Sequence, residues 1–478
     1  MRDLFQKILN RSERGQAIII IAFAMVGLVA MVGLMTDTGI LLIEYAKLKR
    51  GLDAAAIASA SQFRKDFSSD DLVKAAQEFL ILNDSEAQSI VIYRCKRDYL
   101  TNVLDTTADG TIHDETLCTS PRRKLVRIEA VRLVVFGFLR VIGINSTTIS
   151  ATAIGEAASV DLVLVLDNSP SMAFETDPSG DPLFADPGDD PAVCNATDTC
   201  MPFKRVKDAA LELVDRMFFP YDRVAVVTYT DQPPGTSRTA NDVVQELTAN
   251  EADVVNAIAS LQTFQPPDCP YEGLCLDRTP GYYDGLDCFH PDFVSVGNPF
   301  ACTGSDVGSA MRRAGIEFSR EPIRTDSFWA VLVLMGGPAN AGPLSNLPSV
   351  CPSATWFSAP LCRDSDVPTI TRHYSVGGVY PSNFDADDWA RENADYVANP
   401  VTGQGATVFS ICLGEYCRNY PYGLADSAEN LAEYMALTAG NESGVDVNHG
   451  NYYYAPDSSG LSQIFLDIAA NILTRLSQ

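Results

Sequence analysis

The feature that most constrains this chain is an uncharged apolar run near its N-terminus. Ala17 to Met35 holds nineteen residues without a charged side chain, about the length that an α-helix needs to cross the core of a bilayer. Four basic residues precede the run and favour an N-terminus left in the cytoplasm: Arg2, Lys7, Arg11 and Arg14. We therefore expect a cytoplasmic flank over 1–16 and a single membrane span over 17–36. The bulk of the chain would then lie outside the cell membrane.

A cleaved signal peptide is the alternative for this run. The apolar stretch is long for a signal peptide, and no small-x-small cleavage site follows it closely, so a retained anchor is favoured. Beyond Asp37, apolar residues continue to recur at helical spacing up to an alanine-rich segment that ends at Ala60. A helix that extends from the membrane is therefore expected over 37–62.

The cysteines indicate an oxidising compartment. All twelve lie beyond residue 90, they follow one another as six close pairs, and none forms C-x-x-C. An even number in close pairs suits local disulfides, whereas buried thiols of a cytosolic protein are the alternative. Pairing by proximity gives Cys95–Cys118, Cys194–Cys200, Cys269–Cys275, Cys288–Cys302, Cys351–Cys362 and Cys412–Cys417.

The charge of the chain is concentrated in one part. The full sequence carries 35 Lys and Arg against 61 Asp and Glu, a net charge of −26. Residues 1–160 hold 19 basic and 18 acidic side chains, so the remainder carries −27. A polyanion of this size is a poor partner for nucleic acid, and we expect no nucleic-acid binding.

The N-terminal segment resembles a known family. The string RGQAIIIIAFAMVGLVAMVGLMTDTGILLIEYAKLKRGLDAAAIASA is similar to the start of TadG-type proteins of Tad (tight-adherence) Flp pilus assembly. A basic flank, one span, an Asp at its outer end and an alanine-rich helix recur there in that order. The resemblance covers about residues 13–62 and implies an envelope protein associated with a surface pilus or adhesion apparatus.

The segment 63–158 has the pattern of a small α+β module. We expect a helix over 70–82, strands over 89–95 and 124–130, a short apolar helix over 133–144 and a strand over 147–157. No catalytic motif falls in this segment. A stalk between the membrane and the rest of the chain is the simplest interpretation.

The remainder, 159–478, has the pattern of a doubly wound α/β domain. Four near-continuous apolar runs at 160–166, 224–229, 328–335 and 406–413 alternate with helical patterns at 203–218, 251–261, 306–318, 386–397 and 461–476. Strands that are apolar on both faces and separated by helices are typical of a parallel, Rossmann-like sheet covered on each side. The ligand site of such a sheet lies at the carboxyl ends of its strands.

Oxygen ligands follow the first of these strands. Asp167, Ser169 and Ser171 alternate on the loop that leaves the run DLVLVL. One carboxylate and two hydroxyls are the hard ligands that Mg²⁺, Mn²⁺ or Ca²⁺ takes in proteins. A helix cap is the alternative role for such a loop.

This arrangement looks like a von Willebrand factor type A (vWA) domain, whose metal-ion-dependent adhesion site (MIDAS) begins with D-x-S-x-S. The resemblance covers about 160–478 and implies a second loop with a Thr in G-T-x-x-G-x-A-L. Residues 304–311 read GSDVGSAM, which places Ser305 at the Thr position. A third loop usually supplies an Asp, but residues 334–337 read LMGG and place Gly336 there. The resemblance therefore implies a degenerate site with Asp167, Ser169, Ser171 and Ser305.

Three long loops lie at the predicted ligand edge, over 168–202, 263–304 and 336–384, and each contains a predicted disulfide. Loops of this length are usually functional or disordered, and disulfide-stapled insertions favour function. We expect a membrane-anchored adhesion or recognition protein that binds a protein or a surface polymer through this edge. The alternative is a structural Tad component that contacts pilus-machinery proteins without metal. No G-x-S-x-G, H-E-x-x-H or P-loop motif is present, so an enzyme is not expected.

Overall fold

The computed structural model describes residues 2–63, 65, 67–173, 191–230, 243–264, 305–339, 372–377, 379–381, 384–418, 427–441 and 445–475. The chain divides into two compact units, Met1–Ala157 and Ala158–Gln478. Each unit is described on its own.

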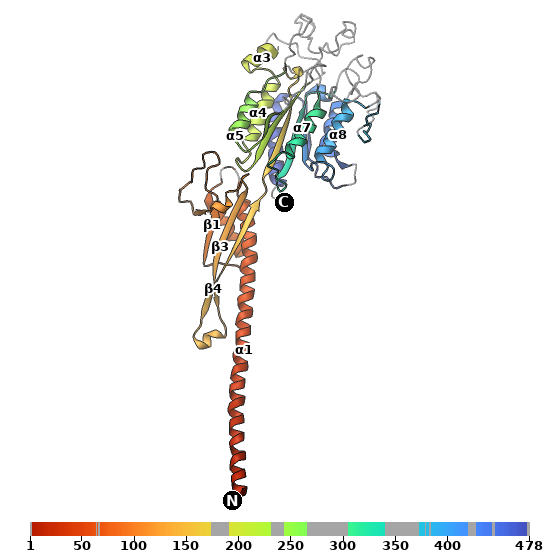
Figure 1. Ribbon diagram of the computed structural model, residues 1–478. Helices are drawn as coiled ribbons and strands as arrows, with labels where there is room; N and C mark the ends of the chain where they lie inside the picture. The colour runs from red at the N-terminus through yellow and green to blue at the C-terminus, as the bar shows by residue number, and fades with distance from the viewer. Residues whose placement is uncertain are drawn as a thin grey trace, which may run out of the picture. The chain divides into compact units, whose positions relative to one another are not determined.

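The first unit combines one very long helix with a small sheet (Figure 1). Helix α1 (Arg2–Ala60) is followed by α2 (Ser69–Leu82), which begins at a capping box formed by Ser68 and Asp71. The sheet has the order β2-β1-β3-β4, with β1 at Ser89–Arg94, β2 at Thr111–His113, β3 at Lys124–Val135 and β4 at Ser146–Ala157. Short 3-10 helices lie at Glu115–Leu117 (η1) and Leu139–Ile142 (η2). From Ala17 onward α1 contains a stretch long and apolar enough to cross a membrane, with a mean hydropathy of 2.8.

The prediction of a helix over 133–144 is wrong. β3 continues to Val135 and pairs antiparallel with β4 from Lys124↔Ala157 to Val135↔Ser146. Leu133 and Val135 are exposed whereas Val134 is buried, which is the two-residue period of a strand. Only η2 is helical, at the tip of the hairpin. The apolar run was long enough to suggest a helix, but its second half belongs to a turn.

A glycine allows β4 to pack closely against α1. A Cβ atom at Gly155 would lie 2.2 Å from the backbone carbonyl oxygen of Ala56. That separation is well inside van der Waals contact, so no residue with a side chain fits there without displacing the helix. Gly155 therefore allows the C-terminal end of β4 to lie directly on the backbone of α1.

The second unit is built on a six-stranded sheet with the order β10-β9-β8-β5-β6-β7. Its strands are β5 (Val160–Asp167), β6 (Arg223–Tyr229), β7 (Val243–Thr248), β8 (Phe328–Met335), β9 (Thr407–Leu413) and β10 (Tyr452–Ala455). All neighbours pair in parallel except β6 and β7, so the expectation of a purely parallel sheet is corrected at one edge. The order reverses between β5 and β8, which makes that gap the topological switch point of a doubly wound sheet.

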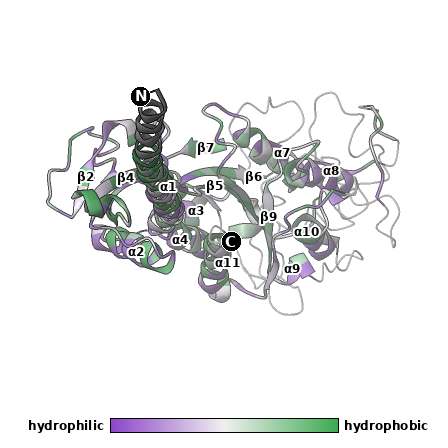
Figure 2. Cartoon of the chain, turned by 90° about the horizontal axis from the view of Figure 1, so that it is seen from below, coloured by the Kyte–Doolittle hydropathy of each residue, from purple (hydrophilic) through white to green (hydrophobic). Residues whose placement is uncertain are grey.

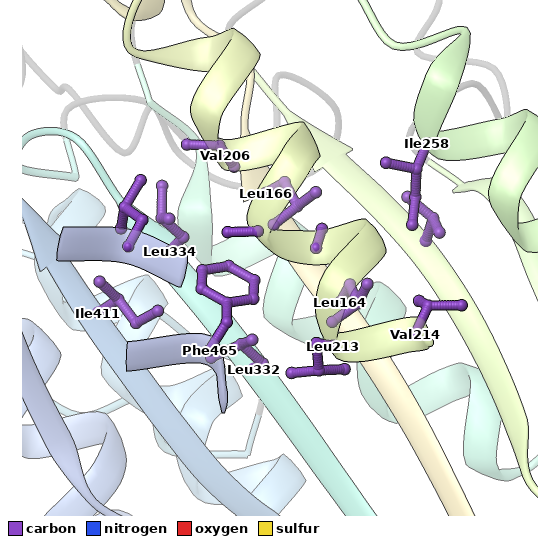
Figure 3. Close-up of a cluster of buried hydrophobic side chains, with 14 of the residues drawn as sticks. Leu164, Leu166, Val206, Leu213, Val214, Ile258, Leu332, Leu334, Ile411 and Phe465 are labelled. Atoms are coloured by element: carbon purple, nitrogen blue, oxygen red, sulfur yellow. The ribbon is translucent and has the colours of Figure 1, made fainter. Parts of the chain in front are cut away.

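Helices cover both faces of this sheet (Figure 2). One face carries α4 (Phe203–Val214), α5 (Glu251–Ala259) and α11 (Leu461–Arg475); the other carries α7 (Val307–Phe318), α8 (Ala386–Ala398) and α10 (Ser427–Leu437). Along β5, Leu164 and Leu166 enter the first core, which also contains Phe465 (Figure 3), whereas Val163 and Val165 enter the second. Both faces of the central strand are therefore buried, as its continuous apolar run predicts. Shorter helices lie at Pro170–Ala173 (η3), Pro191–Thr197 (α3), Glu415–Arg418 (α9) and Ser458–Gly460 (η7).

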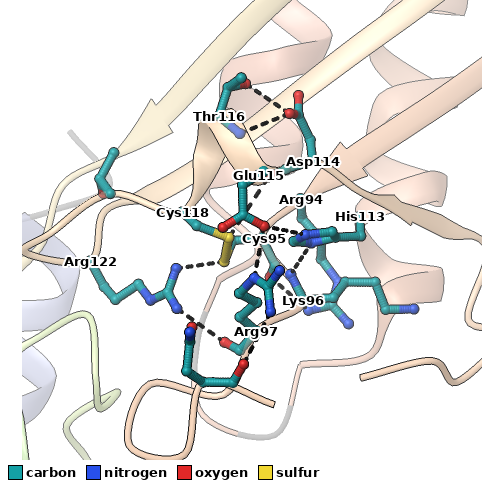
Figure 4. The surroundings of a disulfide bond; sticks show 12 residues. Arg94, Cys95, Lys96, Arg97, His113, Asp114, Glu115, Thr116, Cys118 and Arg122 are labelled. Carbon is teal, nitrogen blue, oxygen red and sulfur yellow. Dashed lines mark hydrogen bonds and ion pairs between the residues drawn. A yellow bond between two sulfur atoms is a disulfide. The ribbon is translucent and has the colours of Figure 1, made fainter. Parts of the chain in front are cut away.

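Three disulfides lie within the described residues. They join Cys95 to Cys118 (Figure 4), Cys194 to Cys200, and Cys412 to Cys417. In each case the two partners are consecutive cysteines in the sequence, which is the pairing predicted from proximity. The other predicted pairs lie outside the described residues: Cys269, Cys275, Cys288, Cys302, Cys351 and Cys362.

Candidate functional site

The candidate site is centred on Asp167, the last residue of β5. Its side chain is fully buried. One carboxylate oxygen accepts the backbone N–H of Ser169 at 2.9 Å, and the other accepts the backbone N–H of Gly336 at 3.1 Å. Gly336 directly follows β8. This second hydrogen bond therefore crosses the switch point of the sheet, where a ligand of a doubly wound domain would bind.

A side chain at position 336, such as the acid that the vWA resemblance implies there, would meet Met172 and require its flexible side chain to shift. A Cβ atom there would lie 2.8 Å from Sδ of Met172 and 3.3 Å from a carboxylate oxygen of Asp167. A second carboxylate would also face Asp167 across this short distance, and two carboxylates in one site repel each other. The glycine is therefore matched to the packing of Met172.

Tyr229 belongs to this site, and sequence reasoning missed it. It ends β6, its register partner on β5 is Asp167, and its hydroxyl donates to the carbonyl of Leu334 at 2.9 Å. Burial raises the pKa of Asp167, and hydrogen bonds from Ser169 and Gly336 oppose that rise. Burial also raises the pKa of Tyr229 well above its usual value, and the neighbouring Asp167 adds to the effect. The signal that could have found Tyr229 is its place at the end of the next apolar run.

The serines occupy the same edge of the sheet. Ser169 is buried beside Asp167. Ser305 is also buried and precedes α7, whose N-cap is Asp306, a carboxylate that accepts the N–H of Ser309 at 3.0 Å. Because α7 leads back to the start of the parallel strand β8, its N-terminus lies toward the carboxyl edge. Ser171 lies in η3, and the structure describes its backbone but not its side chain.

Asn168 adds an acceptor at this edge. Its backbone N–H donates to the carbonyl of Tyr229, and its backbone carbonyl accepts the N–H of Phe264. Its side-chain amide nitrogen donates to the carbonyl of Gln262 at 3.3 Å. The side-chain oxygen Oδ1 is buried and finds no donor among the described residues.

The described residues do not by themselves complete a divalent-cation site. They bring one carboxylate and two or three hydroxyls to the edge, and both oxygens of Asp167 already accept backbone N–H groups. Mg²⁺ and Ca²⁺ take six or more oxygen ligands, some of which are waters, and the described protein groups supply fewer than six. The cation that the sequence predicts at Asp167, Ser169, Ser171 and Ser305 therefore stays a prediction.

A second cluster of ligand-type residues lies in the first unit (Figure 4). His113, Glu115 and Cys118 approach one another closely enough to hold a metal. The sulfur of Cys118 is bonded to Cys95, however, and Nε2 of His113 is 2.9 Å from a carboxylate oxygen of Glu115. A disulfide sulfur is not the thiolate that binds metals. The cluster is therefore a turn held by the disulfide and by the contact between His113 and Glu115.

The amino edge of the sheet, opposite the site, holds a buried ion-pair network. Asp161 near the start of β5 is fully buried and accepts two hydrogen bonds from Arg223, at 2.9 and 2.6 Å, and others from Arg324. These charges satisfy one another, and Arg324 also donates to the carbonyl of Tyr221. The two edges thus differ: the amino edge is closed by ion pairs, whereas the carboxyl edge carries polar groups held by backbone.

Comparison with known proteins shows distant similarity only. No family model matches the chain, and no curated protein is similar to it. Among solved structures, the PilB minor pilin from Streptococcus sanguinis is 12% identical with a TM-score of 0.35, over 82% of this chain and 93% of that one. The pilus adhesin SpaC from Lactobacillus rhamnosus GG, in its open conformation, is 11% identical with a TM-score of 0.35, over 81% and 39%.

A von Willebrand factor type A protein from Catenulispora acidiphila is 11% identical with a TM-score of 0.31, over 73% of this chain and 46% of that one. The chain spans less than half the length of this protein and of SpaC. Similarities at this level do not assign a family. The evidence for the fold is the topology of the sheet itself.

Proposed function

We propose that the protein is a membrane-anchored adhesion or recognition protein whose second unit is a vWA-type domain. One observation carries the proposal: Asp167 and Ser169 lie at the carboxyl end of the central strand, beside the switch point of a doubly wound sheet with one antiparallel edge strand. Ligands of such sheets bind at that place. The D-x-S-x-S spacing and Ser305 before α7 support the vWA assignment.

The placement outside the membrane rests on two independent features. α1 offers one candidate membrane span that begins at Ala17. Disulfides occur in both units, at Cys95–Cys118 and at Cys194–Cys200 and Cys412–Cys417, and disulfides persist in oxidising compartments. Together they support a single-pass topology with the N-terminus in the cytoplasm and both units outside.

The partner we propose is a protein or a polymer with a basic surface. Residues 161–478 carry a net charge of −27, and complementary charge raises the rate and specificity of association. Contact through complementary charge needs no bound cation. The proposed function therefore does not depend on metal binding.

Charge placed at one edge of the sheet tests this function. We compare Asn168→Arg, at the carboxyl edge, with Ile323→Arg, an exposed residue in the turn before β8 at the amino edge. Cells of the source organism that express each full-length variant are tested for attachment to polystyrene and to one another. Asn168→Arg should reduce attachment about tenfold or more, the effect of losing one charged or well-buried contact, and Ile323→Arg should leave it unchanged.

Counting surface pili by electron microscopy separates the two functions that the N-terminal resemblance allows. Attachment lost with pilus number unchanged supports recognition through the carboxyl edge. Pili lost together with attachment would instead support a structural role in Tad assembly. Equal attachment by both variants would contradict a binding site at this edge.

A further inference from the structure

The tip of the β3–β4 hairpin, residues 135–146, presents an exposed apolar surface. Val141 and Ile142 are 80% and 71% exposed, and contiguous exposed apolar patches mark contact sites for proteins or membranes. Other exposed apolar residues of the tip are Val135, Phe138 and Ile144. No acidic residue occurs between Leu133 and Ile149, and Arg140 is the one charge in this segment.

The tip is fastened to α1 at one defined level (Figure 1). The carboxylate of Asp37 accepts the backbone N–H groups of Gly137 at 2.8 Å, Phe138 at 3.1 Å and Leu139 at 2.6 Å. One turn earlier, a Cβ atom at Gly33 would lie 2.0 Å from the ring of Phe138. The ring of Phe138 therefore lies on the bare backbone of the helix.

This level is the outer end of the predicted membrane span. Gly33 belongs to the apolar stretch 17–36, and Asp37 is the first charged residue after it. Leu34 and Met35 on the same turns of α1 are more than half exposed, as expected for a helix surrounded by lipid. The exposed apolar surface of the tip thus lies at the same level along α1 as exposed apolar side chains of that helix.

Backbone groups at membrane depth must find partners within the protein, because lipid offers none. Asp37 supplies them for the three successive N–H groups of 137–139. Within the tip, Phe136, Val141, Gly143 and Ile144 donate to carbonyls of the same turn. The turn can therefore leave water without the cost that an unsatisfied backbone would impose.

We propose that the hairpin tip is a second membrane contact, which enters the outer interface of the bilayer beside α1 and is held there by Asp37. Val141 and Ile142 lie among the upper acyl chains, and the long side chain of Arg140 reaches back to the lipid phosphates. The occupant of this surface is lipid, because the α1 surface at the same level lies in the bilayer. The stalk is then held at two points and cannot swing freely about a single helix.

Tryptophan quenching in liposomes tests the contact. The full-length chain is reconstituted in phosphatidylethanolamine and phosphatidylglycerol, and Val141→Trp is compared with Leu100→Trp. Leu100 is similarly exposed but follows β1 at the opposite end of the sheet. The emission of the native tryptophans at 329, 356 and 389 is subtracted. Lipids brominated near the headgroup end of the acyl chain should remove most of the emission of Trp at 141 and none of that at 100.

Emission from position 141 that brominated lipids leave unchanged would overturn the proposal. If that emission is also blue-shifted, a protein covers the tip, either a second copy or an envelope partner. The anchoring role is tested by adding Asp37→Asn or, as the matched control, Asp53→Asn, whose exposed carboxylate pairs with Lys49 on the same helix. Asp37→Asn should lower the quenching at 141 severalfold while Asp53→Asn leaves it intact; equal quenching in both would refute the role of Asp37.

Discussion

Asp37 in the first unit and Asp167 in the second are both buried carboxylates that hold backbone from far along the chain. Asp37 accepts three consecutive N–H groups of one turn, about a hundred residues away in sequence. Asp167 accepts one N–H from its own loop and one from the end of β8. The first carboxylate fastens a single turn to a helix, whereas the second joins two loops across the switch point.

The difference shows how one chemical group gives two kinds of local structure. A carboxylate bound by three successive N–H groups has the role of a helix cap and leaves little capacity for a ligand. Asp167 accepts two N–H groups and lies beside the hydroxyl-bearing side chains of Ser169 and Tyr229. The first arrangement is suited to fixing position, and the second to an edge that recognises other groups.

The largest effect should come from a carboxylate of a third kind, one paired with arginines. Asp161→Ala leaves Arg223 and Arg324 buried without their partner. Removing one member of a buried ion pair costs about 3–5 kcal/mol, more than either backbone-bound carboxylate should contribute. Urea unfolding followed by the fluorescence of Trp329 and Trp389 measures it.

The exposed pair of Arg320 and Glu246, in the same unit as the two tryptophans, supplies the control for that measurement. Glu246→Ala should change stability by less than about 0.5 kcal/mol. A loss below about 1 kcal/mol in Asp161→Ala would remove the contrast between the two edges of the sheet.

The next largest effect should come from Asp388, a carboxylate whose charged form is disfavoured by burial. Burial raises the pKa of Asp388 to about 6, although hydrogen bonds from His373 oppose the rise. A folded pKa above the unfolded value means that the protonated form stabilises the fold. This contribution is complete below about pH 4 and is lost as the pH rises through 6, with an upper limit of about 3 kcal/mol.

The difference in unfolding free energy between the protein and Asp388→Asn, measured from pH 4 to 8, should follow that curve. Asp467→Asn, on the exposed face of α11, is the matched control for removing one carboxylate from a helix of the same unit. A difference that grows with pH would contradict the assigned sign.

A third substitution asks whether the edge at Asp167 can hold a cation. Gly336→Asp places a side chain against Met172 and Asp167 and should destabilise the unit by about 2 kcal/mol, the usual range for overpacking. The double variant with Met172→Ala relieves the contact. If the edge is otherwise a MIDAS, millimolar Mg²⁺ should raise the melting temperature of the double variant but not that of the unaltered chain, since binding to the folded state stabilises it.

A melting temperature of the unaltered chain that rises with Mg²⁺ and falls with a chelator would mean that the site is complete without the third-loop acid. The cation predicted from the sequence would then be present. Asp167→Asn should abolish any such response.

The smallest of these effects is local to the hairpin. Asp37→Ala leaves the N–H groups of 137–139 without their acceptor, at a cost of about 1–2 kcal/mol. Hydrogen exchange of these amides should accelerate by about an order of magnitude, because each 1.4 kcal/mol is a factor of ten. Exchange of the amides of β1, in the same sheet, serves as the internal control and should not change.

Much of the sheet and helix pattern could be predicted because burial leaves a clear mark on the sequence. The four parallel strands found from continuous apolar runs lie where both faces of the sheet are covered. β7 was missed because an edge strand with one open face carries the mixed sequence VVQELT. The helix expected over 133–144 is wrong at the hairpin tip because an apolar turn has the same composition as a buried helix. The turn also has no regular spacing of apolar residues that would distinguish it from one.

The candidate site divides in the same way. Asp167 and Ser169 were found because they follow an apolar run directly, and strand ends of a doubly wound sheet meet at one edge. Gly336 departs from the expected acid, and its contact with the sulfur of Met172 depends on packing between residues far apart in the chain. A packing contact between residues so far apart in the chain cannot be recognised from a single sequence.

The pairing of β3 with β4 has a mechanical consequence. β4 starts beside Asp37, runs in the same direction as α1 and continues from Ala157 into the second unit. A pull applied at the C-terminal end of β4 along the strand therefore draws it lengthwise against β3 and against the backbone of α1 at Gly155. In this shear geometry all twelve register pairs share the force at once, so a tether of this kind should yield only under a much larger tension than a hairpin opened from one end.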